Sequence, residues 1–501
     1  MPRKVVIIGA GIAGLSAGCY AQMNGYDSEI FELHDIPGGL CTAWERKGYV
    51  IDGCIHYLFG SGEGQPFNQM WQELGAVQSR EMIDHDELMR VIDGDGRTFV
   101  AYCDPDRLEA HLHELSPADA PLSSAFAAGV RQFQRFDMSV LQSKPRRIMT
   151  PADWAHFLGA VLPYTGAMAR WGRLSAARFA NRFHDPLLRA GWKLVFGWEN
   201  IPLMVGMFLL AYLANRNAAF PAGGSLAFAG AIARRYEALG GKIHYKADVE
   251  RILVEGNKAV GLRLYDDSIH MADAVISAAD GRDTLFSMLG EEYLGPGLKR
   301  LYNGSLPLHS QVQVSWGVAR DMSAEPHWAT YLLEKPELIG GLERTALGVK
   351  HYAFDPSLAP EGKAVVEVML ESTYDYWQRI YGRRLYDTEQ RQVCDQVTEH
   401  LERIYPGIRN QIEVSDVVTP LSYERYTGNW LGSTCGWLLT DRTMVKMIAG
   451  LPKKLRALQN FYMAGQWVEP GGSVPVVALS GRNAIQLLCH DDRQPFVATT
   501  A

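Results

Sequence analysis

The chain begins with a continuous apolar run, from Val5 to Ile8, that stops at Gly9. Such a run is typical of a strand covered on both faces, because a strand with one wet face alternates apolar and polar residues. The residues from Ile12 to about Asn24 predict a helix, and Gly25 is expected to end it. A second strand is predicted from Ser28 to Leu33. The order strand, helix, strand indicates a βαβ unit.

Three glycines, Gly9, Gly11 and Gly14, lie where this first strand meets the helix, and Glu32 closes the second strand. In a nucleotide-binding unit the first glycine allows a tight turn, the second lets the backbone approach a pyrophosphate, and the third lets the helix pack close to the strand. The N-terminus of that helix favours phosphate groups. Glu32 can accept hydrogen bonds from ribose hydroxyls and would repel a 2′-phosphate. The pattern predicts FAD or NAD rather than NADP.

Short strands and helices bounded by turn residues follow along the rest of the chain. Strand pairs are expected around Lys47-Gly48 and around Gly94-Asp95-Gly96. Ser473 is expected to cap the last helix. The segment from Val417 to Trp430 is interpreted as a strand that leads into a loop. Further strands are predicted at 242–245, 249–254, 259–265, 274–277, 311–318, 364–370 and 460–465, and further helices at 226–239, 389–404 and 474–488.

Two helical segments, residues 155–169 and 201–214, carry no charged residue apart from a histidine in the first. Both are shorter than the roughly 20 apolar residues that cross a bilayer. Buried core helices are the favoured interpretation of both, and a lipophilic tunnel or a mouth that dips into a membrane is the alternative. Arg146 and Arg147, beside Pro145, are expected in a solvated turn.

The composition narrows the class of protein. A length of 501 residues predicts two or three domains. The net charge is −7 and the sequence has no basic stripe, so we expect no nucleic-acid partner. Seven scattered cysteines form no metal-ligand spacing, and we expect no metal site. The first apolar run is too short for the core of a signal peptide, which predicts a cytoplasmic protein, with peripheral membrane contact kept open.

Three separated blocks of sequence resemble one family. They are GAGIAG with Glu32 and a following glycine doublet, FPAGGS with ADVERILVEGNKAVGLRL and ADAVISAAD, and NFYMAGQWVEPGGSVPVVALSGRNA. Together they resemble the FAD-dependent phytoene desaturase, carotenoid isomerase and retinol saturase group of the amine-oxidase-like flavoproteins. The resemblance implies an α/β fold, with a discontinuous Rossmann-type (GR2-like) FAD-binding domain and an interleaved α+β substrate domain. The FAD-binding domain would comprise residues 1–78, 220–300 and 446–501, and the substrate-binding domain residues 79–219 and 301–445.

The resemblance also implies which residues hold FAD. The glycine loop would cradle the pyrophosphate, Glu32 would bind the adenosine ribose, and Val249 would contact the adenine through its backbone. The start of the last helix would lie at the flavin O2 edge, where its dipole favours the reduced flavin. The full implied set is Gly9, Ala10, Gly11, Ile12, Ala13, Gly14, Glu32, Leu33, Gly39, Leu40, Gly53, Cys54, His56, Val249, Ala279, Gly465, Gln466, Gly472, Ser473 and Val474. Many relatives have arginine where this chain has Leu40, so the sub-branch stays open.

The chemistry implied by the resemblance is hydride transfer between flavin N5 and a lipophilic unsaturated substrate. Desaturation, saturation and isomerisation of an isoprenoid or carotenoid-like polyene share this step. No second GxGxxG follows a strand, so a separate NAD(P)H domain is not expected. Electrons are expected to enter or leave the flavin through the substrate, a quinone, oxygen or a transient reductant. Two alternatives stay open: an amine-oxidase-like enzyme with a smaller polar substrate, and a non-catalytic lipid carrier on the same scaffold. The intact fingerprint argues against the carrier.

Candidates for proton transfer are Glu469 and His56. Glu469 interrupts an apolar, glycine-rich loop, where burial would raise the pKa of a carboxyl group, and a solvated rim position is the alternative. His56 could donate a proton or a hydrogen bond, or be held by one structural hydrogen bond. Trp430, Trp437 and Trp467 could line the substrate cavity, although packing in a core explains them at least as well.

Overall fold

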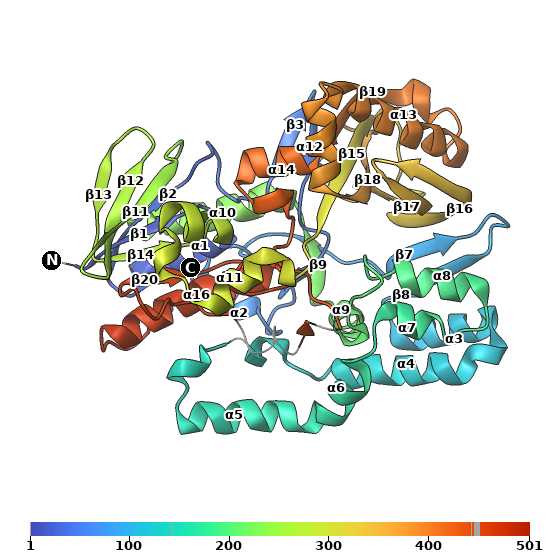
Figure 1. Cartoon of the computed structure of the whole chain (residues 1–501). Helices are drawn as coiled ribbons and strands as arrows, with labels where there is room; N and C mark the ends of the chain where they lie inside the picture. Colours follow the sequence, from blue (N-terminus) through green and yellow to red (C-terminus); the bar gives the residue numbers. More distant parts are fainter. Residues whose placement is uncertain (1, 142, 442, 445–450) are drawn as a thin grey trace.

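The computed structural model of the protein describes residues 2–141, 143–441, 443–444 and 451–501 (Figure 1). The domain boundary expected between residues 445 and 446 lies outside the described residues. Strand β1 (Lys4–Ile8) is the centre of a five-stranded parallel sheet with the order β10-β2-β1-β14-β20. The other four strands are β2 (Asp27–Phe31), β10 (Lys242–His244), β14 (Ala274–Ser277) and β20 (Phe461–Met463).

Both faces of β1 are buried, which explains its continuous apolar run. Val5 and Ile7 belong to a core that includes residues of α1 (Ile12–Met23), α10 (Gly224–Ala238) and α16 (Val474–Asp491). Val6 and Ile8 instead belong to a core shared with a small antiparallel sheet. That sheet consists of β11 (Val249–Glu255), β12 (Lys258–Leu264) and β13 (Ile269–Met271).

The first and last helices pack tightly against each other. A Cβ at Gly481 of α16 would lie 2.2 Å from the Ala13 carbonyl oxygen of α1, so only glycine allows this approach. Ser16 donates a hydrogen bond of 2.7 Å to the Ala478 carbonyl oxygen. The two helices therefore pack as one unit, although 450 residues lie between them in the sequence.

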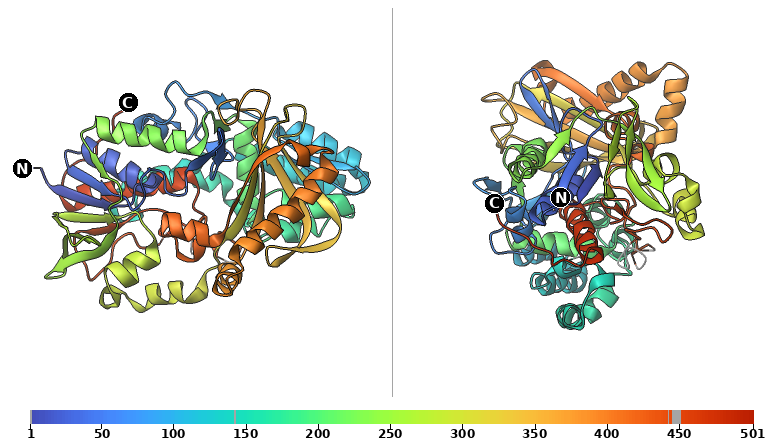
Figure 2. Two further views of the ribbon diagram at one scale, coloured as in Figure 1. Left: turned by 90° about the horizontal axis from the view of Figure 1, so that it is seen from above. Right: turned by 90° about the vertical axis from the view of Figure 1, so that its left-hand side faces the viewer.

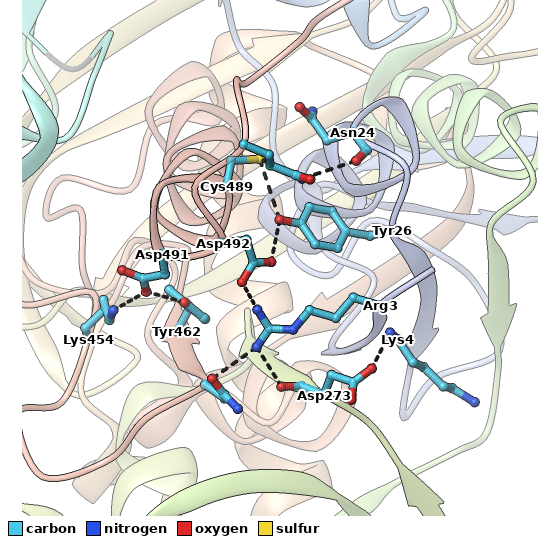
Figure 3. A network of polar contacts seen from close by, with 12 residues as sticks. Arg3, Lys4, Asn24, Tyr26, Asp273, Lys454, Tyr462, Cys489, Asp491 and Asp492 are labelled. Carbon is cyan, nitrogen blue, oxygen red and sulfur yellow. Dashed lines mark hydrogen bonds and ion pairs between the residues drawn. The ribbon is translucent and has the colours of Figure 1, made fainter. Parts of the chain in front are cut away.

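A polar network fastens the far end of α16 to the start of the chain (Figure 3). Arg3 forms an ion pair with Asp492 and donates a hydrogen bond of 2.9 Å to the Asp273 carbonyl oxygen. Tyr26 donates to the same Asp492 carboxylate at 2.9 Å. Asp491 accepts from Tyr462 at 2.5 Å and pairs with a lysine. These contacts join the two chain ends on the side of the parallel sheet (Figures 1 and 2).

A seven-stranded mixed sheet forms the other end of the molecule, with the order β19-β15-β18-β17-β16-β7-β8 (Figure 1). Helices α12 (Tyr374–Gly382) and α13 (Tyr386–Ile404) cover one face through Trp377, Val393 and Val397. The strands are β7 (Glu87–Ile92), β8 (Thr98–Tyr102), β15 (Ser310–Val318), β16 (Trp328–Ile339), β17 (Leu342–His351), β18 (Ala364–Ser372) and β19 (Ile412–Val418).

A layer of helices runs along the lower side of the molecule in Figure 1, from beneath β7 and β8 to beneath α16. It contains α3 (Pro105–Leu115), α4 (Ala120–Phe133), α5 (Pro151–Val161), α6 (Thr165–Trp171), α7 (Ala176–Ala180), α8 (Pro186–Leu194) and α9 (Leu203–Ala214). The shorter elements elsewhere include α2 (Asn68–Glu73), β3 (Ala43–Arg46), β4 (Tyr49–Asp52), β5 (Leu58–Phe59), β6 (Met82–Ile83), β9 (Ala218–Pro221), α11 (Pro296–Arg300) and α14 (Pro420–Thr427).

The two uncharged helical segments have opposite environments. Helix α9 is buried along almost its whole length, as expected. Helix α5 has no buried residue, so the interpretation of residues 155–169 as a core helix is wrong for α5. Leu158 is 47% exposed, and Leu162, just after the helix, is 60% exposed. Among the described residues, none of the helices combines the length and apolar character needed to cross a membrane.

One local prediction is wrong, and one hairpin was not predicted. The segment after β19 is helix α14 rather than a loop, because Thr419 and Ser422 form a capping box and Pro420 stands in the first turn. The hairpin of β16 and β17 was missed, although its turn contains Gly340 and Gly341, both with positive φ. A bulge between Leu332 and Glu337 interrupts β16 and hides its alternation. The predicted α/β class, with a parallel sheet and an interleaved mixed sheet, is confirmed.

Candidate active site

The glycine loop between β1 and α1 has the geometry that its sequence indicates. Gly9 has a φ of +92°, which favours glycine. A Cβ at Gly14 would lie 1.9 Å from the Gly9 carbonyl oxygen, so this glycine is needed for helix packing. Gly11 differs, because it has an ordinary extended conformation and a Cβ there would meet only the Gly38 carbonyl oxygen, at 3.8 Å. The protein itself therefore leaves the space beside Gly11 open.

Glu32 lies next to this loop and is buried. Its carboxylate accepts hydrogen bonds from the backbone N–H of Ala10 at 2.5 Å and of His34 at 2.9 Å. Burial raises the pKa of Glu32, while the two backbone hydrogen bonds oppose the shift. Because a carboxylate has about four acceptor positions, Glu32 can still accept from hydroxyl groups of a ligand.

Segments from distant parts of the sequence meet at the same loop. Gly38 donates to the Ala10 carbonyl oxygen at 2.9 Å, and a Cβ at Gly39 would lie 3.3 Å from the Gly11 Cα. Ala279 comes shortly after β14 in the sequence and lies next to Gly9 in space. Gly465 comes shortly after β20 and lies next to Ala13. Val249 begins β11, and the nearby Ala247 donates to the Glu32 carbonyl oxygen at 2.9 Å.

The other predicted cofactor residues lie along two loops and on the surface. Gly53, Cys54 and His56 follow β4, and the Asp52 carboxylate accepts from the Cys54 N–H at 3.0 Å. The side chain of Leu33 is exposed. A second group stands before and at the start of α16, namely Gln466, Gly472, Ser473 and Val474. Ile12 begins α1, and Leu40 is half-buried after the glycine doublet.

No side chain among the described residues caps the N-terminus of α1 or of α16. Ser473 occupies the expected N-cap position, but its hydroxyl does not cap the helix. The N–H groups in the first turn of each helix are therefore available to a ligand, and the helix dipole favours negative charge there. The two helix starts come from opposite ends of the sequence and are held together by the packing of α1 on α16.

A cavity of about 1330 Å³ reaches the loop that precedes α16. Helix α9 contributes Met204, Phe208 and Leu209 to its mostly apolar wall. Glu469 and Ser473 contribute polar groups at the loop. The cavity therefore joins a largely apolar space to the helix start for which the resemblance implies a flavin contact.

Glu469 is 5% exposed, so the alternative of a rim carboxylate in water is wrong. It forms an ion pair with Lys453, whose side chain is 13% exposed. Both residues line the cavity. A buried pair of this kind places both a proton acceptor and a cation at the wall of a largely apolar space.

The three tryptophans do not lie where a role in lining the substrate cavity would require them. Trp430, Trp437 and Trp467 pack on one another and on Tyr302, with ring centroids 5.0–6.2 Å apart. None of the three is among the described residues that line the large cavity. Packing in the core beneath β11–β13 accounts for them, and the interpretation as cavity lining receives no support from the structure.

A buried polar cluster beside His56 was missed by the sequence analysis. Lys350 of β17 lies with its Nζ 2.7 Å from His56 Nδ1, and Glu367 of β18 stands directly opposite Lys350 in the sheet. Burial lowers the pKa of Lys350 to about 8 and raises the pKa of Glu367 to about 8. The sequence signal that could have indicated this cluster is a charged residue inside a continuous apolar strand, as in AVVEVML around Glu367.

A comparison with known families decides the class of this protein. Residues 12–489 match the model of the family described as flavin containing amine oxidoreductase. The chain belongs to this family. It is therefore a flavin-dependent oxidoreductase whose cofactor is FAD, as the resemblance predicted.

Relatives and solved structures agree with this assignment. Prolycopene isomerase 1 from an Oncidium hybrid cultivar is 26% identical over 95% of this chain and 82% of its own length. A lycopene-forming phytoene desaturase from Pseudescherichia vulneris is 24% identical over 98% of this chain and 99% of its own. A putrescine oxidase structure shares the fold, with a TM-score of 0.61 and 14% identity over 98% and 99% of the two chains. The resemblance identified from the sequence blocks is thus confirmed.

The residues of this chain fit FAD. The open space beside Gly11, the remaining acceptor capacity of Glu32 and the two uncapped helix starts suit a pyrophosphate, a ribose and an electron-rich ring edge. We therefore propose that the cofactor residues predicted above hold FAD between the starts of α1 and α16. The side chain of Leu33 is exposed, so this residue would contribute only through its backbone.

Proposed function

We propose that this flavoenzyme acts on a lipophilic unsaturated substrate, an isoprenoid or carotenoid-like polyene, by desaturation, saturation or isomerisation. The single observation that carries the proposal is the apolar cavity of about 1330 Å³ that ends at the loop before α16. Sites for small ligands usually measure roughly 300–1000 Å³. A cavity of this size and polarity suits a long hydrocarbon better than a small amine. The names of the full-length relatives support the same substrate class.

The chain's own residues would bind and orient the polyene. The side chains of α9 give the cavity a largely apolar wall, which favours apolar ligands. When bound, FAD supplies a hydride acceptor or donor at N5. Glu469 lines the cavity wall, forms an ion pair with Lys453, and is proposed to exchange a proton with the substrate. His56 is proposed to donate a hydrogen bond to the substrate.

The function is tested by mixing the FAD-loaded protein anaerobically with cis and trans polyenes and, separately, with di- and monoamines. Bleaching of the flavin absorbance by a polyene, or conversion of a polyene with the flavin oxidised again at the end, supports the proposal. Bleaching by amines alone would favour the alternative with a smaller polar substrate. Binding of polyenes with neither bleaching nor conversion would favour a lipid carrier.

We also propose that the protein docks on an anionic membrane surface through α5. The side chains of Trp154, Leu158 and Leu162 are spaced by four residues and are all at least 38% exposed. Arg147 and Arg173, which flank α5 and α6 in the sequence, are exposed. An exposed apolar helix face with basic residues nearby in the sequence is typical of a helix that lies in a lipid interface. A protein docked in this way would have its apolar cavity close to a lipid bilayer, whose interior is hydrocarbon.

We expect the protein to sediment with vesicles of phosphatidylglycerol and phosphatidylcholine, and to bind less as salt is added. The double substitution Leu158→Ser and Leu162→Ser should weaken vesicle binding about tenfold, because apolar area is lost from the interface. Leu338→Ser is the matched control, since Leu338 is 68% exposed but lies on β16. Equal binding by the double variant and the control would contradict the docking proposal.

A further inference from the structure

The cluster around Lys350 carries an inference that rests on the proposed function but goes beyond it. Lys350 is 4% exposed, and its Nζ has no carboxylate oxygen within 4.0 Å among the described residues. Its nearest polar partners are His56 Nδ1 at 2.7 Å and the Tyr352 hydroxyl at 3.2 Å. A buried lysine is ordinarily paired with a carboxylate. The structure instead directs this ammonium group at an imidazole.

The two nearby carboxylates are engaged elsewhere. Asp52 accepts from the Ser225 N–H at 2.6 Å and the Ser225 hydroxyl at 2.7 Å, in addition to the Cys54 N–H. Glu367 accepts from Gln313 at 2.7 Å and from the Tyr352 hydroxyl at 3.4 Å, both through the same oxygen. The other oxygen of Glu367 is buried and has no hydrogen-bond partner in the part of the chain that the structure describes. The cluster therefore holds Lys350 in place without neutralising it by direct contact.

The contact fixes the hydrogen of the imidazole. A lysine ammonium can only donate, so His56 Nδ1 must accept and the ring hydrogen must stand on Nε2. Burial and the charge of Lys350 lower the pKa of His56 well below its usual range, so the ring stays neutral. No hydrogen bond is found at His56 Nε2 within the described residues. The half-buried ring therefore keeps one N–H group available to a bound molecule.

We propose that Lys350 is a positioning residue, which holds His56 in the tautomer that presents an Nε2–H donor to the substrate or the flavin ring. His56 lies on the loop that the resemblance places beside the flavin. Its ring also contacts Trp328, with centroids 5.5 Å apart, so its orientation is restricted on a second side. Lys350 itself touches neither substrate nor cofactor in this proposal.

The proposal implies a pH dependence with a definite sign. Burial lowers the pKa of Lys350 to about 8, while the charges of Glu367 and Asp52 oppose the shift. Below about pH 8 the ammonium can only donate, and above it the neutral amine can also accept from His56. The tautomer preference should therefore weaken as the pH rises through about 8. The other titratable groups that face Lys350 or sense its charge are Tyr352, His85, His327 and His351.

The test is nitrogen NMR of the ring atoms in protein labelled with ¹⁵N-histidine, with the His56 signals assigned by their loss in His56→Gln. At pH 7 we expect an Nε2–H tautomer in the unmodified, FAD-loaded protein, which shifts toward a mixture above pH 8. Lys350→Met should give the mixture already at pH 7, and Lys350→Arg should restore the Nε2–H form because it retains a donor. Lys335→Met, an exposed lysine on β16, is the matched control and should change nothing.

The rate of flavin reduction by a polyene is the second readout, with an expected loss of about tenfold in Lys350→Met, the size of one charge-assisted hydrogen bond. If the unmodified protein and all its variants failed to turn over polyenes while the tautomer results were as expected, the proposed function would be refuted. The inference that Lys350 fixes the His56 tautomer would still hold. An unchanged His56 tautomer in Lys350→Met would overturn the inference. If Lys350→Met does not fold, the pH titration of the unmodified protein decides, and a tautomer that stays constant from pH 7 to pH 9 would overturn it.

Discussion

Gly11→Val is expected to give a folded protein that purifies without FAD. Gly11 has a backbone conformation that valine can adopt, and a Cβ there meets only one protein atom, at 3.8 Å. The added methyl groups would instead occupy the space that we assign to the pyrophosphate. We expect flavin content to fall at least about tenfold, which corresponds to about 1.4 kcal/mol of binding free energy.

Two other glycine substitutions sharpen this result. Gly14→Ala should prevent folding, because its Cβ would lie 1.9 Å from the Gly9 carbonyl oxygen. Gly94→Val is the matched control, since nothing lies within 4 Å of a Cβ at Gly94, in the distant β7–β8 turn. Flavin absorbance and circular dichroism of the purified variants separate the outcomes. A yellow Gly11→Val protein with the flavin content of the control would refute the assigned cofactor position.

The second large effect is expected at Glu469, in two measurements that separate stability from chemistry. Glu469→Ala leaves the buried cation of Lys453 without its partner, which should lower the free energy of unfolding by about 3 kcal/mol. The double variant Glu469→Leu with Lys453→Met should recover most of this loss, because neither charge remains. Denaturant unfolding of the single and double variants checks the effect.

Glu469→Gln keeps the size of the side chain and tests the proton role. We expect polyene turnover to fall about a hundredfold while the flavin stays bound, the lower range for loss of a general acid or base. Glu292→Gln is the matched control, because Glu292 also lines the cavity but is exposed. Turnover in Glu469→Gln equal to that of the control would remove Glu469 as the acid or base.

Local patterns predicted the nucleotide-binding half of the fold well. The β1 run, the helix stop at Gly25 and the acid after β2 depend on interactions between neighbours in the sequence, and α1 ends at Met23 with Gly25 in a positive φ conformation. The packing role of Gly14 also follows from local geometry. These signals are strong because the backbone conformation that must be adopted and the residue that allows it lie in the same short segment.

The elements that the sequence did not predict depend on distant partners. The environment of α5 could not be read from its composition, because the uncharged segment that begins at residue 155 suits a core and a membrane surface equally. Lys350 meets His56 only through a sheet whose strands are far apart in the sequence. The tryptophans were ambiguous for the same reason, since only the packing on Tyr302 distinguishes a core from a cavity wall.

The most direct test of the central claim, that the cavity brings a polyene to the flavin, compares anaerobic polyene-dependent reaction in the unmodified protein and in Val205→Trp. Val205 lines the cavity on α9, and the larger side chain would fill part of it. Val497→Trp is the control, because Val497 is 46% exposed near the chain end. The account predicts that Val205→Trp retains its FAD but loses polyene bleaching and conversion, whereas the control keeps both. Unchanged polyene reaction in a folded, FAD-loaded Val205→Trp protein would contradict the account.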